Sequence, residues 1–297
     1  MRDTPIQPDT PTKHVDVCPL LVVGGGAMAS AILSGAAGAD LLDGPCVVAE
    51  PDADKRKTIG TLSPSIDAVE SIADAFDALP YDDATVLLAV KPQMLGQVAE
   101  EIDACVGEAM LEGRCVISIL AGVTIEKLKG TLKARIVRVM PNLPISVGQG
   151  ATAMSGGPDA TGEDLDRAHR LFGAASQVFD LPEDAIDAFT AAAGSGPAYA
   201  FLLAEAMAAG AIEAGNDQGL NETTTRAIIA QTLRGAAEML ARPCNGELAD
   251  PAALRAAVTS KGGTTATALD VLEARGVRNA VREAVLAAAK RAGELGS

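Results

Sequence analysis

The chain has 297 residues, too many for one ordinary hydrophobic core, so we expect two domains of about 100–200 residues each. Hydrophobic residues make up 48% and charged residues 21%, a balance that is typical of globular proteins and excludes a mostly disordered chain. The net charge of −15 repels phosphate backbones and anionic lipid, which argues against nucleic acid and membrane surfaces as partners.

The first 17 residues are polar and rich in proline, so we expect a flexible leader before the fold begins. This segment has no apolar core and does not resemble a secretory signal. No apolar run approaches the roughly 18–20 uncharged residues of a bilayer-spanning helix, so we expect no membrane span.

The cysteines and histidines limit the possible chemistry. His14 and His169 both lie in polar stretches, which argues against a zinc site or a histidine-based triad, and we expect no metal. The cysteines are scattered without Cys-x-x-Cys spacing, which indicates reduced thiols in a cytoplasmic protein. They are Cys18, Cys46, Cys105, Cys115 and Cys244.

Residues 18–182 alternate short β-branched runs with helical stretches. The predicted buried strands are 20–23, 46–50, 85–90, 115–119 and 135–140. Helices are expected at 27–42 and 94–111, and edge strands at 151–154 and 177–180 around a helix over 164–174. Continuous apolar strands separated by helices predict an α/β Rossmann domain, with a doubly wound, mostly parallel sheet.

Residues 183–297 have no obvious strands, and Ala, Leu, Glu and Met recur at helical spacing, which predicts an all-α domain. The expected helices are 199–214, 222–240, 251–258, 265–275 and 278–295. Their apolar faces are too broad for so short a stretch to bury, which suggests that they pack against another subunit.

A glycine-rich turn follows the first predicted strand. Residues 24–29 (GGGAMA) match G-x-G-x-x-G/A and open a helix, the context that a dinucleotide-binding turn requires. Gly24 permits the tight turn, Gly26 lets the backbone approach a pyrophosphate, and Ala29 allows close packing of helix and strand. We therefore expect NAD(P)H to bind here.

Glu50 ends the second predicted strand, at the distance from Gly26 where an acidic residue accepts hydrogen bonds from the adenosine ribose. Such a carboxylate repels a 2′-phosphate and favours NADH. Lys55, Arg56 and Lys57 follow closely and are suited to neutralise a 2′-phosphate, or simply form a solvated start to a helix. The sequence leaves the choice between NADPH and NADH open.

Three further segments follow strands on the side where ligands bind in this architecture. Residues 89–93 (AVKPQ) contain Lys91, for which solvent exposure is a better explanation than catalysis by its amine. Residues 118–123 (SILAGV) end with a turn suited to lie beside a flat ring. Asn142, in a proline-flanked loop, either serves a nicotinamide or holds its own loop by an Asx turn, and the second is the default.

The helical half has two glycine-bearing helix entries, at residues 194–197 and 259–265. The second exposes backbone N–H donors suited to a small carboxylate, with Lys261 adding positive charge. The alternative is ordinary N-capping by Thr264 or Thr265.

Together these residues resemble the pyrroline-5-carboxylate reductase family over nearly the whole chain. The segments that carry the resemblance are 24–32 (GGGAMASAI), 89–93 (AVKPQ), 118–123 (SILAGV), 138–144 (RVMPNLP), 194–199 (GSGPAY) and 254–265 (LRAAVTSKGGTT). The chain departs from the family at Lys261, where proline is common. It also has no asparagine between Pro51 and Pro141 for the adenosine side, and Glu247 is out of register with the family's acidic residue.

The resemblance implies NAD(P)H-dependent reduction of 1-pyrroline-5-carboxylate to L-proline, the last step of proline biosynthesis. It also implies a homodimer, and in many family members such dimers assemble further into decamers. The implied cofactor contacts, besides Glu50, are Val23, Gly24, Gly25, Gly26, Ala27, Met28, Ala89, Val90, Lys91, Pro92, Ile119, Leu120 and Ala121. The implied substrate contacts are Ser260, Gly263, Thr264 and Thr265. Thr265 is the candidate catalytic residue, as the hydroxyl nearest the ring nitrogen.

Two other functions remain open. One is reduction of another cyclic imine or of a β-hydroxy acid. The β-hydroxy acid needs a lysine base on a helix of the second domain, and neither Lys261 nor Lys290 suits that role. The other is a non-catalytic, NAD(P)-binding dimeric sensor.

Overall fold

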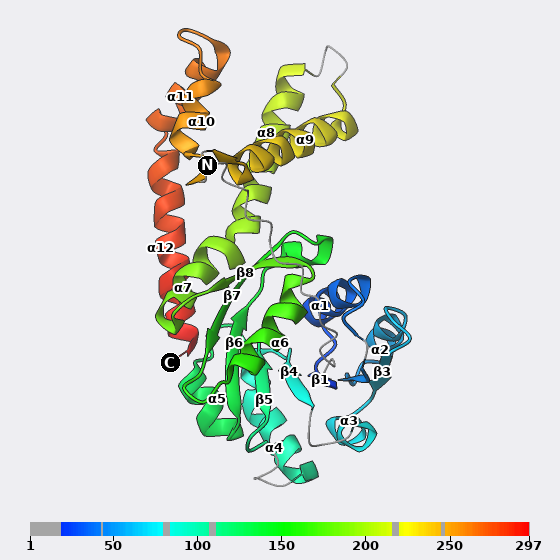
Figure 1. Cartoon of the computed structure of the whole chain (residues 1–297). Coiled ribbons are helices and arrows are strands. Elements are labelled where there is room, and N and C mark those ends of the chain that lie inside the picture. The colour runs from blue at the N-terminus through cyan, green and yellow to red at the C-terminus, as the bar shows by residue number, and fades with distance from the viewer. Residues whose placement is uncertain are drawn as a thin grey trace, which may run out of the picture. The chain divides into compact units, whose positions relative to one another are not determined.

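A computed structural model describes residues 19–42, 44–79, 84–106, 111–215, 220–244 and 247–296 (Figure 1). The predicted leader, including His14, lies outside the described residues. The chain forms two compact units: the first contains the described residues up to Ile186, and the second is Asp187–Leu295. The boundary expected after residue 182 lies a few residues before the observed one after Ile186, and just before the short 3₁₀ turn Glu183–Ala185.

The described residues of the first unit form an eight-stranded sheet in the order β3-β2-β1-β4-β5-β6-β7-β8 (Figure 1). The strands are β1 (Leu20–Val23), β2 (Cys46–Ala49), β3 (Ile66–Val69), β4 (Thr85–Leu88), β5 (Cys115–Ser118), β6 (Arg135–Met140), β7 (Gly150–Gly156) and β8 (Ser176–Asp180). Strands β1 to β6 are parallel, β7 runs antiparallel to β6, and β8 is parallel to β7. This confirms the expected mostly parallel sheet.

Alternating side chains of the strands divide the core of this unit into two layers. The helices are α1 (Ala27–Gly38), α2 (Ala53–Gly60), α3 (Ile72–Ala78), α4 (Leu95–Val106), α5 (Ile125–Leu132) and α6 (Gly162–Gly173). Leu21 and Val23 pack in a cluster with residues of α3, α4 and α5. Leu20 and Val22 pack in the other cluster, with residues of α1 and α6. The apolar runs are continuous because both faces of each strand are buried.

Strand β3 and the short helices α2, α3 and α5 have no predicted ranges. A helix of seven or eight residues shows only about two turns of its hydrophobic pattern. β3 lies at the edge of the sheet, and only Ile66 of its four residues is fully buried. Helix α1 ends at Gly38, earlier than expected, where Asp40 turns the chain with a φ of 53°. Most other boundaries differ from those expected by only a few residues, as frayed ends usually do.

The helices that follow the sheet are α7 (Ile186–Phe189), α8 (Gly196–Gly215), α9 (Glu222–Ala241), α10 (Pro251–Ala257), α11 (Thr264–Ala274) and α12 (Val277–Gly296). The expectation of no strands here is wrong in one detail. Two short strands, β9 (Pro243–Cys244) and β10 (Glu247–Leu248), form an antiparallel ladder.

Helix α8 presents a large apolar surface within the second unit. Phe201, Leu202 and Leu203 are 56%, 66% and 48% exposed. By length and composition alone, the helical stretch Glu183–Gly215 is long and apolar enough to cross a membrane, so the expectation that no run approaches this length is wrong. Only 6% of its most apolar window is buried, and exposed apolar surfaces of this size are typical of interaction sites.

An ion pair between a part-buried arginine and a buried carboxylate joins β6 to α6. The Nε and Nη2 atoms of Arg135 donate to the two oxygens of Asp164, at 2.7 and 2.9 Å, and Thr161 N donates to the same carboxylate at 2.8 Å. Burial alone raises the pKa of the Asp164 carboxyl, but the hydrogen bonds from Arg135 and Thr161 outweigh burial and hold this pKa well below its usual range. The carboxylate therefore stabilises the folded state over the whole neutral range.

We expect Asp164→Asn to lower the free energy of unfolding by about 3 kcal/mol at pH 7, because a part-buried guanidinium loses its counter-charge. The folded-state pKa is depressed, so this stabilisation is present above about pH 4, the ordinary carboxyl pKa, and is lost as the pH falls further. Urea unfolding should therefore show a smaller difference between wild type and variant at pH 3 than at pH 7. Glu163→Gln, which removes an exposed partner of Arg167, is the control and should cost no more than about 0.5 kcal/mol. Equal losses in the two variants would contradict this account.

Candidate functional site

The chain leaves β1 through a turn that only glycine fits at its first position. Gly24 has a φ of +99°, and its N–H donates to Ala49 O at 2.9 Å. A Cβ atom on Gly24 would lie 2.8 Å from Ala89 O and 2.9 Å from Val90 Cγ1. The turn is thus packed against the end of β4, next to two predicted cofactor contacts.

Glu50, at the end of β2, holds the same turn from the other side. Its Oε2 accepts a hydrogen bond from Gly25 N at 2.8 Å, and its Oε1 accepts one from Asp52 N at 3.0 Å. The residue is only 6% exposed. A Cβ atom on Gly25 would lie 2.4 Å from Ile59 Cδ1 and 3.0 Å from Glu50 Cβ, so a side chain here would have to displace Ile59 and press on Glu50.

Gly26 differs from its neighbours because it faces open space. A Cβ atom here would have no described heavy atom within 4 Å. Gly26 is the N-cap residue of α1, and among the described residues no side chain caps that helix start. The uncapped N–H groups carry the positive end of the helix dipole, so this turn fits the pyrophosphate of a dinucleotide that approaches the backbone closely.

A cavity of about 280 Å³ opens between the glycine turn and the start of α2. The lining residues are Gly25, Ala27, Ser30, Asp54, Lys55 and Thr58. The sequence motifs do not identify Ser30, Asp54 or Thr58 as candidate site residues. Helical spacing is the signal that could have found two of them, because Ser30 lies one turn after Gly26 and Thr58 one turn after Lys55.

The ends of β4 and β5 lie beside the end of β1, as the sequence predicts. Ala89 N donates to Val23 O at 2.9 Å, and Ile119 N donates to Leu88 O at 3.1 Å. The side chains of Val23 and Leu120 are buried in the core, and Leu120 N donates to Ser118 Oγ at 3.3 Å. The predicted contacts at residues 89–92 and 119–121 therefore follow adjacent strands at one edge of the sheet.

Lys91 takes the exposed position that the sequence favoured, whereas Asn142 holds its loop by a contact other than the expected Asx turn. Lys91 is exposed and precedes the 3₁₀ turn Pro92–Met94. Asn142 is buried, and its Oδ1 accepts a hydrogen bond from Ala151 N at 2.9 Å. Asn142 thus holds its loop to β7, a longer-range contact than the expected Asx turn.

The predicted substrate residues surround the start of α11, in the second unit. Gly262 turns the chain with a φ of +72°, and Gly263 N donates to Ser260 O at 3.0 Å. Gly263 is the N-cap residue, and no side chain among the described residues caps the helix, so the alternative of capping by Thr264 or Thr265 is wrong. Thr264 is exposed and Thr265 is half-buried. The uncapped helix start fits a small carboxylate.

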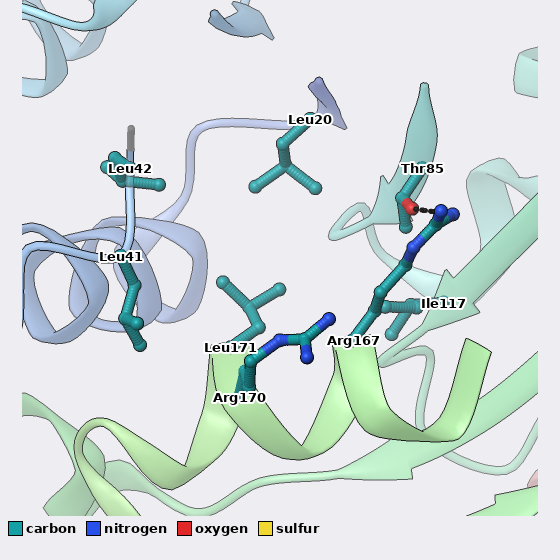
Figure 2. A pocket seen from close by; sticks show the side chains of 8 residues that line it. All are labelled: Leu20, Leu41, Leu42, Thr85, Ile117, Arg167, Arg170 and Leu171. Atoms are coloured by element: carbon teal, nitrogen blue, oxygen red, sulfur yellow. Dashed lines mark hydrogen bonds between the residues drawn. The ribbon is translucent and has the colours of Figure 1, made fainter. Parts of the chain in front are cut away.

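A second cavity, of about 60 Å³, lies near the amino ends of β1 and β4 and contains none of the predicted site residues (Figure 2). It is lined by Leu20, Leu41, Leu42, Thr85, Ile117, Arg167, Arg170 and Leu171. Arg167 Nη1 donates to Thr85 Oγ1 at 3.5 Å. The cavity has room for only a water or two, far less than a dinucleotide needs.

The described cysteines offer no reactive thiol in the core. Burial raises the pKa of Cys46 to about 12, and burial followed by the charge of Asp164 also raises the pKa of Cys115. Cys105 is exposed and free, while the side chains of Cys18 and Cys244 lie outside the described residues. Within the described ranges, no group of three or more His, Cys, Asp or Glu side chains could hold a metal ion.

The chain is similar to proteins of one enzyme family, both in family models and in individual relatives. Residues 183–295 match the family model of pyrroline-5-carboxylate reductase dimerisation, and residues 20–122 match that of NADP oxidoreductase, coenzyme F420-dependent. The pyrroline-5-carboxylate reductases of Mycobacterium tuberculosis and Synechocystis sp. are each 36% identical to the chain, over 93% of it and over 96% and 97% of their own lengths.

Solved structures agree with the sequence matches. A pyrroline-5-carboxylate reductase from Coxiella burnetii is 31% identical, with a TM-score of 0.79 over 95% of this chain and 100% of that one. The Plasmodium falciparum pyrroline carboxylate reductase, solved with NADP bound, is 26% identical, with a TM-score of 0.79 over 94% of this chain and 98% of its own.

Proposed function

The chain belongs to the pyrroline-5-carboxylate reductase family, and we propose that the glycine turn after β1 and the start of α11 are the cofactor and substrate sites of its reaction. The enzyme is an oxidoreductase that acts on a C=N bond and reduces 1-pyrroline-5-carboxylate to L-proline with NAD(P)H. The open space at Gly26, beside an uncapped helix start, is the observation that best supports the cofactor site.

Residues 18–182 bind the cofactor in this proposal. The N–H groups at the start of α1 hold the pyrophosphate, and the main chain at residues 89–92 and 119–121 lines the path toward the nicotinamide. Bound NAD(P)H would supply the hydride for the C=N carbon, and the ring nitrogen takes up one proton from solvent, so that the imine becomes a secondary amine. The chain's contribution is mainly to position the two reactants.

Residues 183–297 supply the substrate site and the dimer contacts. The uncapped start of α11 binds the substrate carboxylate, with Ser260, Gly263 and Thr264 around it and Lys261 adding positive charge. Thr265 places its hydroxyl near the ring nitrogen, as a hydrogen-bond partner or proton relay. An iminium already attracts hydride, so the reaction needs no metal or strong acid from the protein.

The family match of residues 183–295 supports an oligomer. The exposed apolar surface of α8 supports a homodimer that buries Phe201, Leu202 and Leu203, rather than insertion into a membrane. We also propose that such dimers assemble into a decamer and that the protein is located in the cytoplasm. The net charge of −15 supports the further proposal that nucleic acids are not partners. Sedimentation equilibrium distinguishes a dimer from a decamer.

We expect Thr265→Ala combined with Ser260→Ala to lower kcat/KM by about 100-fold, the effect of losing a positioned proton partner and one carboxylate contact. Thr265→Ser keeps the hydroxyl and should keep most of kcat. Steady-state rates with saturating NADPH measure both. If the double variant retains wild-type kcat and kcat/KM, the substrate site has been placed wrongly.

A further inference from the structure

The carboxylate of Glu183 joins three parts of the first unit that are far apart in the chain. Glu183 begins the short 3₁₀ turn after β8, and its Oε1 atom accepts hydrogen bonds from Ile125 N at 2.7 Å and Arg138 Nη1 at 3.0 Å. Ile125 is the first residue of α5, and Arg138 lies in β6. These contacts span 58 and 45 positions of the chain, so they exist only in the folded unit.

The surroundings of this carboxylate make both hydrogen bonds strong. The side chain of Arg138 is 6% exposed and that of Glu183 is 30% exposed, so solvent screens their charges only in part. At Ile125 the carboxylate satisfies a main-chain N–H at the positive end of α5. Hydrogen bonds with a charged partner are stronger than neutral ones. Glu183 therefore fixes the start of α5 to β6.

The start of α5 also ends a turn that belongs to the proposed cofactor site. Residues 119–121, which line the path toward the nicotinamide in that proposal, lie in the turn between β5 and Ile125. The start of the turn is held to β4, because Ile119 N donates to Leu88 O at 3.1 Å. Its end is held by Glu183 through Ile125 N. A turn that is fixed at both ends has little freedom to move away from a bound ring.

Core packing holds the same turn in a less directional way. The side chains of Leu120, Val123 and Ile125 are buried in one apolar cluster. Apolar burial depends on the area removed from water and hardly on direction, whereas a hydrogen bond requires a defined geometry. The contact with Glu183 thus adds a fixed orientation of the main chain to a turn that packing already keeps in place. Its loss should disturb the site without unfolding the unit.

We propose that Glu183 is a positioning residue for the nicotinamide end of the cofactor, which it affects through the turn at residues 119–124. This inference rests on the proposed cofactor site, which it refines. The pyrophosphate end of that site is held separately, because the glycine turn after β1 packs against β4 and is bonded to Glu50. Glu183 therefore influences the binding of the nicotinamide ring and the rate of hydride transfer, and leaves the binding of the rest of the cofactor unchanged.

The test uses ligands that differ only in the nicotinamide ring. NADPH is compared with 2′-phospho-ADP-ribose, and NADH with ADP-ribose, by titration calorimetry of the full chain, and the pair that binds more tightly is used for the variants. The wild type should bind the complete cofactor more tightly than its truncated analogue. Glu183→Ala should lower this affinity ratio and kcat by about tenfold each, the effect of losing one charge-assisted contact. Glu183→Gln keeps an oxygen that accepts from Ile125 N, so it should lower the ratio by only about threefold.

Two variants control for charge and for stability. Asp184→Ala removes an exposed carboxylate from the next position of the same 3₁₀ turn and should leave the ratio unchanged. Asp164→Asn should also leave the ratio unchanged, although it destabilises the fold, because its carboxylate binds Arg135 at the start of β6. A loss of stability by itself weakens both ligands of a pair by the same factor.

The outcomes separate this inference from the cofactor site on which it rests. An unchanged ratio in Glu183→Ala, or equal weakening of both ligands, would overturn the positioning role and leave the cofactor site in place. Equal affinities of the two ligands for the wild type would overturn it as well. If Glu183→Ala does not fold, the ratio and kcat of Glu183→Gln decide in the same way. Failure of all four ligands to bind the wild type would contradict the cofactor site itself.

Discussion

Replacing Gly26 with alanine is expected to raise the Kd for NADPH by about 100-fold or more. The added methyl group would separate the pyrophosphate from the N–H groups of α1, so that charge-assisted hydrogen bonds between them are lost. The fold should tolerate the change. Gly26 has a φ of −68°, and a Cβ atom there has no described neighbour within 4 Å. We therefore expect the free energy of unfolding to stay within about 1 kcal/mol of wild type.

Gly24→Ala is the contrasting variant for this experiment. Its φ of +99° and the approach of Ala89 O to 2.8 Å make any side chain strained, so the variant should lose stability by more than about 1 kcal/mol. NADPH fluorescence titration and chemical denaturation measure the two effects. If Gly26→Ala binds NADPH like the wild type, the pyrophosphate does not lie on this turn.

Introducing a carboxylate at position 264 is expected to weaken substrate binding by a similarly large factor. In Thr264→Glu the new charge lies at the uncapped start of α11, where it stabilises the helix by about 0.3–1 kcal/mol. The same charge repels the substrate carboxylate and occupies its donors, so the KM for 1-pyrroline-5-carboxylate should rise by about 100-fold. Stability and substrate affinity thus change in opposite directions.

Thr264→Gln is the matched control, with a side chain of similar size and no charge. It should raise KM far less than Thr264→Glu does. Neither variant should alter the Kd for NADPH, because the proposed cofactor site lies at the glycine turn between β1 and α1. Steady-state kinetics and NADPH titration test these expectations together. An unchanged KM in Thr264→Glu would show that the substrate carboxylate binds elsewhere.

The parts of the fold that the sequence predicts well are those whose signal is local. β1, β4 and β5 are continuous apolar runs because both of their faces are buried, and the glycine turn follows β1 directly. Strand β3 is an edge strand with a single fully buried residue, so its sequence carries too weak a pattern to identify it.

The site shows the same division between local and long-range signals. Spacing alone places Glu50 at the end of β2, but the direction of its carboxylate depends on Gly25 N, which is 25 positions away in the chain. The start of α11 depends on the turn at Gly262, whose positive φ brings Gly263 to the N-cap position ahead of the two threonines. Conformations of this kind follow from packing and backbone geometry that residue types do not reveal.

The central claim is that the protein reduces 1-pyrroline-5-carboxylate with NAD(P)H. The most direct test mixes the purified protein with this substrate and either NADPH or NADH, and monitors cofactor oxidation by the nicotinamide absorbance. We expect oxidation of NADPH, NADH or both, and one L-proline formed for each cofactor molecule oxidised. No oxidation with either cofactor, by protein shown to bind NADPH, would contradict it and favour another imine as substrate or a non-catalytic sensor.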